Sequence, residues 1–293
     1  MTKTHWQSAI RTLLNSESGI YGPESFRDYI ADIGLDPRNY RTPAEISIDS
    51  KRKLAGELEE NDTMVLRLGK APDGTGTQFA LVRVEGGLDD FFINETEVQT
   101  DQVVEFDLRP DSQDTQIFNQ QTQDMLLAYQ LLPHFSESSL VNLALSTGLL
   151  SHALDLDVEA VGTAPVTVSS TFNFSFQPHS TSAATLRHNN GQVEVDTCFV
   201  SRRNGKRVLV VVEAKKGRKR SIAKHKLFYP LMGLRSEVSD SVFEVIPVYL
   251  RGKQTDNGID YSIYECSPFD VEKSNPCLSS LSVESHTQYR LQI

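Results

Sequence analysis

The sequence predicts a mixed α/β fold in its second half, preceded by a smaller α+β region. Three observations predict it. Apolar residues recur with helical spacing over long segments, other segments have the alternating or continuous apolar patterns typical of strands, and in the second half these follow one another as helix, three strands, helix and two strands. A chain of 293 residues, 39% of them hydrophobic and 23% charged, is long enough for one large domain or two smaller ones.

The first region, residues 1–106, combines a helix with two strands. Helical spacing predicts a helix over Pro23–Ile33, and the segments Met64–Leu68 and Gln78–Val84 have the pattern of strands on either side of a turn. The polar and acidic residues 107–116, which include a proline, are typical of a linker. We therefore expect an N-terminal α+β domain over 1–106, then a linker, then a second domain over 117–293.

The second domain begins with two predicted helices, Phe118–Leu132 and Ser136–Leu154, and Ser136 is a suitable N-cap for the latter. A later helix, over Lys219–Val238, contains Pro230, which should kink it or end part of it. The elements that follow are predicted in this order: strands Val166–Phe176, Gln192–Val200 and Lys206–Lys215, a helix over Lys219–Val238, and strands Val242–Leu250 and Ile259–Glu265.

Charge is distributed unevenly along the chain. The formal net charge is -10, but residues 202–226 contain eleven Lys or Arg and the single acid Glu213, so the rest of the chain has a net charge of -20. A polyanion such as a nucleic acid should therefore be attracted to one place only. The alternative interpretation is an ordinary solvated charge run.

Cysteine usage and hydropathy limit the class of protein. The cysteines Cys198, Cys266 and Cys277 are odd in number, widely spaced and without a C-x-x-C pair, which disfavours a zinc site and a disulfide framework. No apolar run approaches the ~20 residues that cross a bilayer, and no signal peptide is recognisable at the N-terminus. We expect a reduced, cytoplasmic protein without a membrane partner.

The strongest local signal is the pair Asn204-Gly205 between two apolar strands. Both residue types accept the positive φ angles of a type I′ turn, so the pair predicts a two-residue β-hairpin. In that register Asp196 lies opposite Glu213 and Glu194 lies opposite Lys215. Because side chains alternate between the faces of a strand, these four charged groups should form one patch.

This patch predicts a metal site. Two opposed carboxylates with Cβ atoms ~5 Å apart repel each other unless a cation lies between them. Mg²⁺ prefers hard oxygen ligands and usually keeps several waters, and a lysine beside it can orient a water or stabilise charge on a phosphate. The alternative is a solvated strand face, but the apolar run Val208–Val212 favours a strand that is buried on both sides.

Asp196 followed by Glu213-Ala214-Lys215 resembles the signature of the PD-(D/E)XK nucleases, the superfamily that includes most type II restriction endonucleases. The resemblance covers about residues 136–250 and implies a restriction-endonuclease-like core, which is an αβββαβ unit with a mixed central sheet flanked by helices. It implies that Asp196, Glu213 and the carbonyl of Ala214 bind Mg²⁺, and that Lys215 assists the attacking water. Val195 replaces the proline that often precedes the first aspartate.

Some members of the superfamily add an acid from the first core helix, and Glu137 is the candidate here. Glu194 is either a further ligand or a partner of Lys215. His225 is expected to contact phosphate or solvent rather than metal. The basic residues expected to contact DNA are Lys216, Arg218, Lys219, Arg220 and Lys224.

The resemblance implies a Mg²⁺-dependent endonuclease that hydrolyses double-stranded DNA, most specifically a type II site-specific restriction enzyme. Such enzymes commonly act as homodimers and have a DNA methyltransferase as a genetic partner. The region 1–106 would assist DNA recognition or dimerisation. Two alternatives remain open: a repair or junction-processing nuclease of the same fold, and a DNA-binding protein without activity.

Overall fold

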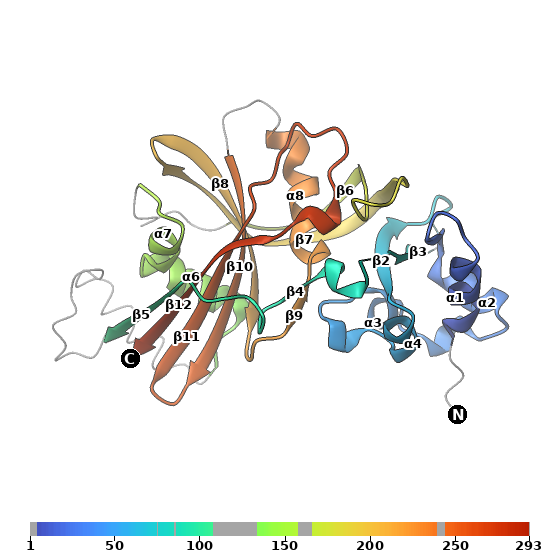
Figure 1. The fold of residues 1–293 in the computed structure, drawn as a ribbon, viewed down its shortest axis with the longest axis horizontal. Helices are drawn as coiled ribbons and strands as arrows, with labels where there is room; N and C mark the ends of the chain where they lie inside the picture. Colours follow the sequence, from blue (N-terminus) through green and yellow to red (C-terminus); the bar gives the residue numbers. More distant parts are fainter. Residues whose placement is uncertain are drawn as a thin grey trace.

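The computed structural model describes residues 5–74, 76–84, 86–107, 134–157, 166–238 and 244–292. Across these residues a ten-stranded mixed sheet runs the length of the molecule, with the N-terminal elements at one end and the C-terminal strands at the other (Figure 1). Its strand order is β1-β3-β2-β7-β8-β10-β11-β12-β5, and β6 pairs with β7 beside this path. The fold is therefore mixed α/β, as the sequence predicts.

The N-terminal elements form a small α+β unit. The two predicted strands are confirmed as β2 (Thr63–Lys70) and β3 (Thr77–Arg83), which pair antiparallel. The predicted helix over Pro23–Ile33 begins later, because Pro23 belongs to a strand and the side chain of Ser25 caps the helix by accepting a hydrogen bond from the Asp28 N–H at 3.4 Å. The other elements of this unit are α1 (Gln7–Leu14), β1 (Ile20–Ser25), α2 (Phe26–Asp32), α3 (Thr42–Ile46) and α4 (Gly56–Glu60), with short 3-10 turns at Pro37–Asn39 and Lys51–Lys53.

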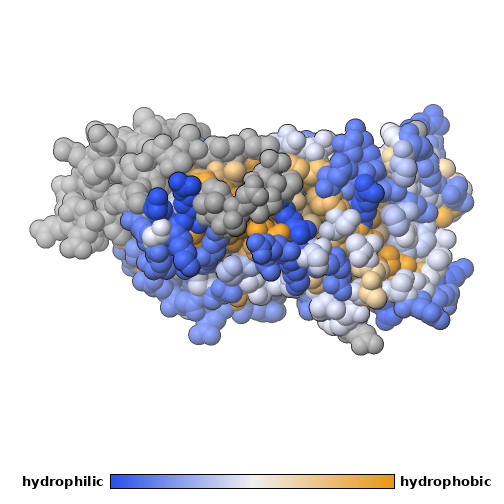
Figure 2. All heavy atoms as spheres, turned by 90° about the horizontal axis from the view of Figure 1, so that it is seen from above, coloured by the Kyte–Doolittle hydropathy of each residue, from blue (hydrophilic) through white to orange (hydrophobic). Residues whose placement is uncertain are grey.

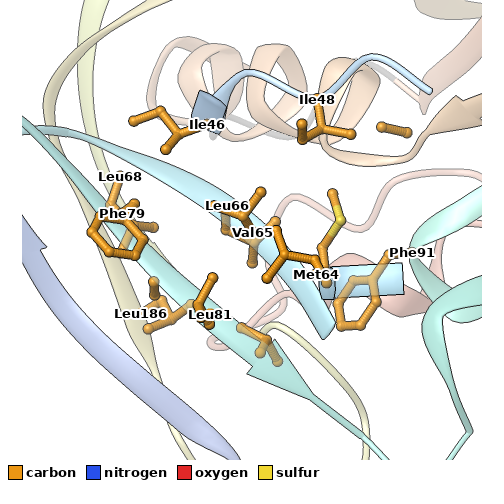
Figure 3. Packing of buried hydrophobic residues seen from close by; sticks show 14 of the residues in the cluster. Ile46, Ile48, Met64, Val65, Leu66, Leu68, Phe79, Leu81, Phe91 and Leu186 are labelled. Carbon is orange, nitrogen blue, oxygen red and sulfur yellow. The ribbon is translucent and has the colours of Figure 1, made fainter. Parts of the chain in front are cut away.

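This unit shares its hydrophobic core with the second half of the chain. Figure 3 shows buried residues of β2 and β3 together with Leu186, which comes from β7 (Leu186–Arg203) and belongs to the same cluster. The same cluster includes Phe176 of β6 (Val166–Phe176) and Phe228 of α8 (His225–Val238). Gly69 joins β2 to β7 within the sheet: it pairs with Asn189, and a Cβ at this positive-φ position would lie 2.3 Å from the Asn189 carbonyl oxygen.

Residues 88–107 continue from the N-terminal unit into the second half. After a 3-10 turn at Leu88–Phe91, strand β4 (Phe92–Asn94) pairs with β9 (Ser221–Ala223), and β5 (Gln102–Asp107) forms the sheet edge parallel to β12 (Val283–Gln292). The end of the expected domain 1–106 is therefore built into the sheet of the second half. The remainder of the expected linker, 108–116, and the predicted helix 118–132 lie outside the described residues.

The order helix, three strands, helix and two strands is present in the second half, with the short strand β9 and the last strand β12 added. The predicted helix over Ser136–Leu154 is divided into α6 (Glu137–Ser146) and α7 (Leu149–Ala153), because Gly148 between them has φ +73°. Ser136 is the N-cap, as predicted, and accepts from the Ser139 N–H at 3.0 Å. The remaining strands are β8 (Lys206–Lys216), β10 (Glu244–Thr255) and β11 (Gly258–Cys266), and a 3-10 turn follows at Leu278–Ser280.

The helix predicted over Lys219–Val238 is wrong at its start. Residues 221–223 pair with β4 as strand β9, so the helix begins only at His225. It also continues through Pro230 instead of ending there. Pro230 has no N–H, so this helix lacks one backbone hydrogen bond, the one to the carbonyl of Lys226 in its first turn.

The helices cover both faces of the sheet. Helices α6 and α7 pack on one face of β8, β10 and β11, and α8 packs on the other. Strand β8 lies in the middle, antiparallel to β7 and parallel to β10, and its residues Val208–Val212 are all buried, as the continuous apolar run predicts.

Most large hydrophobic side chains are covered. Among the described residues, the exposed ones are Leu14, Val103 and Val200. On the face drawn in Figure 2, hydrophilic residues alternate with smaller hydrophobic areas near the middle of the view.

Candidate active site

The predicted hairpin register is confirmed. The pairs run from Arg203 and Lys206 at the turn to Thr197 and Val212, and the turn residues Asn204 and Gly205 have φ +52° and +74°. These angles are those of a type I′ turn. Both turn N–H groups donate to the carboxylate of Asp157, at 2.8 and 2.6 Å.

The paired ladder ends one residue before the expected pair of Asp196 with Glu213. On its other side, β7 slips in register against β6: Val195 and Cys198 face Val168 and Val166, so β7 has one extra residue between them. A β-bulge of this kind redirects a side chain and is frequent beside active sites. Asp196 lies in the bulge, and its Oδ2 accepts a hydrogen bond from the backbone N–H of Ala214 at 2.9 Å.

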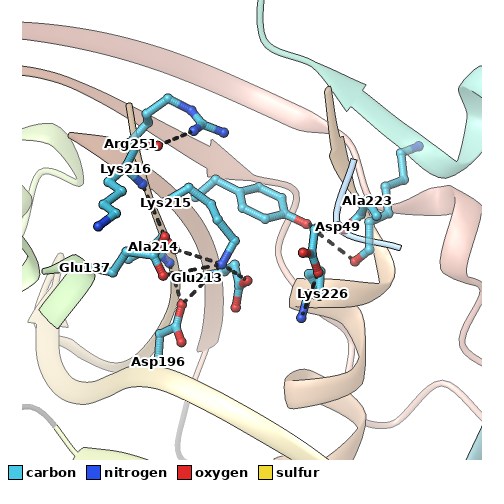
Figure 4. A network of polar contacts seen from close by, with 12 residues as sticks. Asp49, Glu137, Asp196, Glu213, Ala214, Lys215, Lys216, Ala223, Lys226 and Arg251 are labelled. Atoms are coloured by element: carbon cyan, nitrogen blue, oxygen red, sulfur yellow. Dashed lines mark hydrogen bonds and ion pairs between the residues drawn. The ribbon is translucent and has the colours of Figure 1, made fainter. Parts of the chain in front are cut away.

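The ammonium group of Lys215 lies at the centre of the cluster (Figure 4). Its Nζ is 2.7 Å from Oε1 of Glu213, 3.0 Å from the carbonyl oxygen of Ala214 and 3.9 Å from Oδ2 of Asp196. A third carboxylate oxygen, Oε2 of Glu137, lies 3.8 Å away. The structure therefore brings the three predicted catalytic side chains and the predicted carbonyl ligand together around one point.

Burial changes the acid–base properties of this cluster. Burial and the nearby Asp196 carboxylate raise the pKa of Glu213 to about 7, although Lys215 acts in the opposite direction; the Glu213 side chain is only 5% exposed. Burial alone would lower the pKa of Lys215, but the surrounding carboxylates outweigh it and raise that pKa to about 12. Lys215 is therefore a protonated ammonium near neutral pH.

The donor set fits a hard divalent cation. The Lys215 ammonium stands where such a cation would lie, within reach of oxygens from Asp196, Glu213 and Ala214. Carboxylate and carbonyl oxygens suit Mg²⁺, which completes its shell with water. Within the described ranges no group of three or more His, Cys, Asp or Glu side chains is arranged to hold a metal, so the fit depends on two carboxylates and one carbonyl.

The two additional acids differ in their placement. Glu137, at the start of α6, joins the cluster: its Oε1 accepts from the Lys216 N–H at 3.3 Å in addition to its contact with Lys215. Glu194 is exposed and lines the same cleft, but the ion pairs that the structure gives for Lys215 are with the other three acids. The expected opposition of Glu194 and Lys215 is lost because the ladder ends at the bulge.

A cleft of about 300 Å³ opens beside the cluster. The acids and Lys215 line one part of it, and the other part is lined by residues that the sequence analysis did not select: Ser47, Arg67 and Tyr229. His225 also lines the cleft. The next residue, Lys226, lines it as well and forms an ion pair with Asp49 at 3.2 Å. Ser47 and Arg67 come from the N-terminal unit, so no local sequence signal could have associated them with Glu213.

The basic run occupies two places rather than one. Residues 202–207 lie at the hairpin turn, where Arg203 pairs with Glu265, and β8 separates them from the basic residues that follow Lys215. Near the cluster, Lys216, Arg218 and Arg220 are exposed. The expectation of a single basic surface is therefore wrong, because an eleven-residue strand spaces its ends far apart.

The two remaining expected DNA contacts are partly withdrawn from solvent. Lys224 donates to the carbonyl of Ser279 at 2.9 Å, and burial lowers its pKa. Lys219 lies 5.9 Å from the centre of the Tyr264 ring, and burial lowers its pKa too. Lys219 and Arg218 nevertheless line a second cleft, of about 250 Å³, that also contains Lys253, Arg251, Arg290 and the single acid Asp260.

Comparisons with known proteins place most of the chain in one family. Residues 103–290 match the family model described as "Domain of unknown function (DUF6997)". No curated protein and no solved structure matches the chain. No helix in the described part of the chain is long and apolar enough to span a membrane.

Proposed function

We propose that this chain, which belongs to the DUF6997 family, is a magnesium-dependent endonuclease that hydrolyses phosphodiester bonds in double-stranded DNA. One observation supports this most directly: Asp196, Glu213, Lys215 and the Ala214 carbonyl meet around a single point at the edge of an open cleft. A solvated strand face would spread these charges in water. Here Glu213 is almost completely buried instead, which is costly for a charge without a specific partner.

The arrangement of strands supports the same proposal. The meander β6-β7-β8, the helix α8 and the parallel neighbour β10 agree with the αβββαβ core that the PD-(D/E)XK resemblance implies. The acids lie on the second and third strands of that meander, at the end where Glu137 begins the preceding helix α6.

The residues have complementary roles in the proposed reaction. Asp196, Glu213 and the Ala214 carbonyl would hold Mg²⁺, which when bound supplies Lewis-acid stabilisation of negative charge on the phosphate and lowers the pKa of water. Because its pKa is raised, Lys215 stays protonated and donates hydrogen bonds to the attacking water or to a phosphate oxygen; it does not act as the general base. Glu137 restrains this ammonium from the opposite side.

The exposed Lys216, Arg218 and Arg220 would bind the DNA backbone next to the cluster. We further propose that the enzyme is a site-specific restriction endonuclease acting as a homodimer, with a DNA methyltransferase as its genetic partner. The N-terminal unit supports this proposal over a compact junction-processing enzyme, because it enlarges the chain beyond the core and lines the cleft with Ser47 and Arg67.

The test is incubation of the full chain with plasmid and phage DNA in Mg²⁺ or in EDTA. Discrete fragments that appear only with Mg²⁺ are expected, and Asp196→Asn should abolish them, whereas Asp256→Asn in the exposed β10–β11 turn should not. Smeared products or cleavage of branched DNA alone would replace the restriction proposal with a repair or junction-processing nuclease. Binding without cleavage in any divalent metal would mean a DNA-binding protein without activity.

A further inference from the structure

The part of the cleft away from the carboxylates has polar groups without partners. The Nδ1 of His225, the hydroxyl of Tyr229 and the Oγ of Ser47 are each buried, and within the described residues none of these atoms has a hydrogen-bond partner. His225 is 6% exposed and Tyr229 is 7% exposed. Leaving a buried polar atom unpaired costs about 1–3 kcal/mol, so such atoms are rare without a reason. Here all three line one cleft.

An arginine supplies positive charge to this part of the cleft. Arg67 of β2 lines it, and none of the ion pairs formed by the described residues involves Arg67. Lys226, in the first turn of α8, lines the cleft too, but its charge is matched by the ion pair with Asp49 at 3.2 Å. Of the acids that line the cleft, Glu137, Asp196 and Glu213 gather around Lys215, and Glu194 is exposed to solvent. The cleft therefore has an acidic part that suits a cation and a donor-rich part that suits an anion.

The donor-rich part matches the chemistry of a phosphate group. A phosphodiester oxygen only accepts hydrogen bonds, and the guanidinium of Arg67 and the hydroxyls of Ser47 and Tyr229 can all donate. Burial keeps His225 neutral, with its pKa lowered to about 3, so its ring carries one N–H and in the Nδ1–H tautomer donates as well. The edge of a guanine also accepts hydrogen bonds from an arginine, but only through the two in-plane atoms N7 and O6, whereas phosphate oxygens accept from several directions and suit donors from four side chains.

We propose that Arg67, Ser47, Tyr229 and His225 form a binding site for a second phosphate of the substrate strand, next to the phosphate that is cleaved. This inference rests on the proposed nuclease function. The N-terminal unit thereby completes the substrate site, because two of the four residues come from it and two from α8. Holding two successive phosphates fixes the strand along its axis and aligns the scissile bond with Lys215.

The first experiment measures binding without cleavage. Inorganic phosphate is titrated into the full chain in EDTA near neutral pH, and the side-chain NMR signals of its seven histidines are followed. A saturable shift is expected that is confined to His225 and to His188, a buried histidine of β7 that lines the same cleft. Arg67→Gln should weaken binding about tenfold or more, as for a hydrogen bond to a charged group. Arg83→Gln, an exposed arginine on the neighbouring strand β3, is the matched control and should bind like wild type.

Conservative variants separate binding from folding. Tyr229→Phe and Ser47→Ala remove only a hydroxyl that has no partner, so the melting temperature should stay or rise, while phosphate affinity falls about threefold to tenfold. A loss of stability without loss of affinity would overturn the proposal. Shifts produced by adenosine, which has no phosphate, but not by inorganic phosphate would also overturn it in favour of a base-binding pocket.

A second experiment uses DNA that the wild-type chain cleaves. Replacing one phosphate at a time by a neutral methylphosphonate should identify one flanking position that slows single-turnover cleavage, and in Arg67→Gln that substitution should have no further effect. If the methylphosphonate slows cleavage equally in Arg67→Gln and wild type, the inference is overturned and the nuclease proposal stays intact. Arg67-dependent phosphate binding without any cleavage would overturn the nuclease function and leave the anion site.

Discussion

The Nζ of Lys215 lies 2.7 Å from Oε1 of Glu213, two residues away on the same strand; the Glu213 side chain is almost excluded from water, and that of Lys215 is 23% exposed. Alternate residues of a strand share a face, so the contact follows directly from the sequence spacing. Its consequence is chemical: the carboxylate keeps the lysine protonated, and the lysine occupies the position that suits a metal cation. The predictions below start from this pair.

Replacing Lys215 by alanine should nearly abolish cleavage. The ammonium is the cationic donor nearest to the reacting phosphate in the proposed mechanism, and removing one such donor typically lowers kcat by about 10²–10³-fold. Single-turnover cleavage measures the effect, and DNA affinity in EDTA should change little. Lys206→Ala, at the turn end of the same strand, is the matched control and should cleave at the wild-type rate. An active Lys215→Ala variant would show that the site is assigned incorrectly.

Glu213 should make stability fall as pH rises. Its pKa is about 7 in the folded protein and 4.5 ordinarily, so the folded state holds its proton more tightly than the unfolded state. The favourable contribution is complete below about pH 4.5 and is lost as pH rises to about 7, by up to ~3 kcal/mol. The comparison is with Glu213→Gln, which does not titrate, in urea unfolding without metal. The free energy of unfolding of Glu213→Gln, relative to that of wild type, should increase between about pH 4.5 and about pH 7. A difference that does not change with pH would contradict the prediction.

The hairpin and its charged patch could be predicted because they depend on local chemistry. Asn204 and Gly205 specify the turn, the turn sets the register, and alternation then brings Glu213 and Lys215 to one face. The apolar patterns likewise identify β6, β8 and α6. Burial of one face produces a periodic pattern of apolar residues, and burial of both faces produces a continuous apolar run.

The rest depends on contacts between residues far apart in the chain. The bulge at Asp196 arises where β7 pairs with β6 on one side and β8 on the other, and no glycine or proline marks it. The start of α8 was misplaced because residues 221–223 pair with β4, more than a hundred residues earlier. Similarly, only the tertiary structure turns Lys224 toward Ser279 and brings Arg67 to the cleft.

Magnesium should stabilise the folded chain through the same carboxylates. A ligand that binds only the folded state at ten times its Kd adds about 1.4 kcal/mol, which corresponds to a rise in Tm of about 2 °C or more for a chain of this size. Thermal unfolding with and without Mg²⁺ at pH above the Glu213 pKa measures this. Asp196→Asn should lose the rise, and Asp256→Asn should keep it. A rise of equal size in all three proteins would mean that the ion binds elsewhere.

The exposed arginines should contribute to DNA affinity, whereas Lys224 should not. Arg218 and Arg220 are free in solvent near the cluster, but the Lys224 ammonium is held by the Ser279 carbonyl. The double variant Arg218→Ala, Arg220→Ala should bind duplex DNA about tenfold more weakly in EDTA, and its salt dependence should decrease by about two phosphate contacts. Lys224→Ala should bind like wild type. Equal losses of DNA affinity in the double variant and in Lys224→Ala would mean that Lys224 also belongs to the DNA-binding surface.

The buried ion pair between Arg251 and Glu95 should be essential for stability near the site. Two of their N–O distances are 2.6 and 2.5 Å, the Glu95 side chain is fully buried, and Glu95 also accepts from the Arg220 N–H at 2.9 Å. Arg251 is the β10 partner of Lys215, so the pair ties the segment after β4 to the catalytic strands. Arg251→Ala leaves a buried carboxylate without its cation and should cost about 3–5 kcal/mol in urea unfolding.

The double variant Glu95→Gln, Arg251→Met shows whether that loss comes from the uncompensated charge. Glutamine keeps an oxygen that accepts from the Arg220 N–H, and methionine fills much of the space of the arginine stem, so no buried charge remains. The double variant should therefore recover most of the stability that Arg251→Ala loses. If it is as unstable as Arg251→Ala, the pair acts through geometry that only the two charged groups provide, and the electrostatic explanation of the loss is wrong.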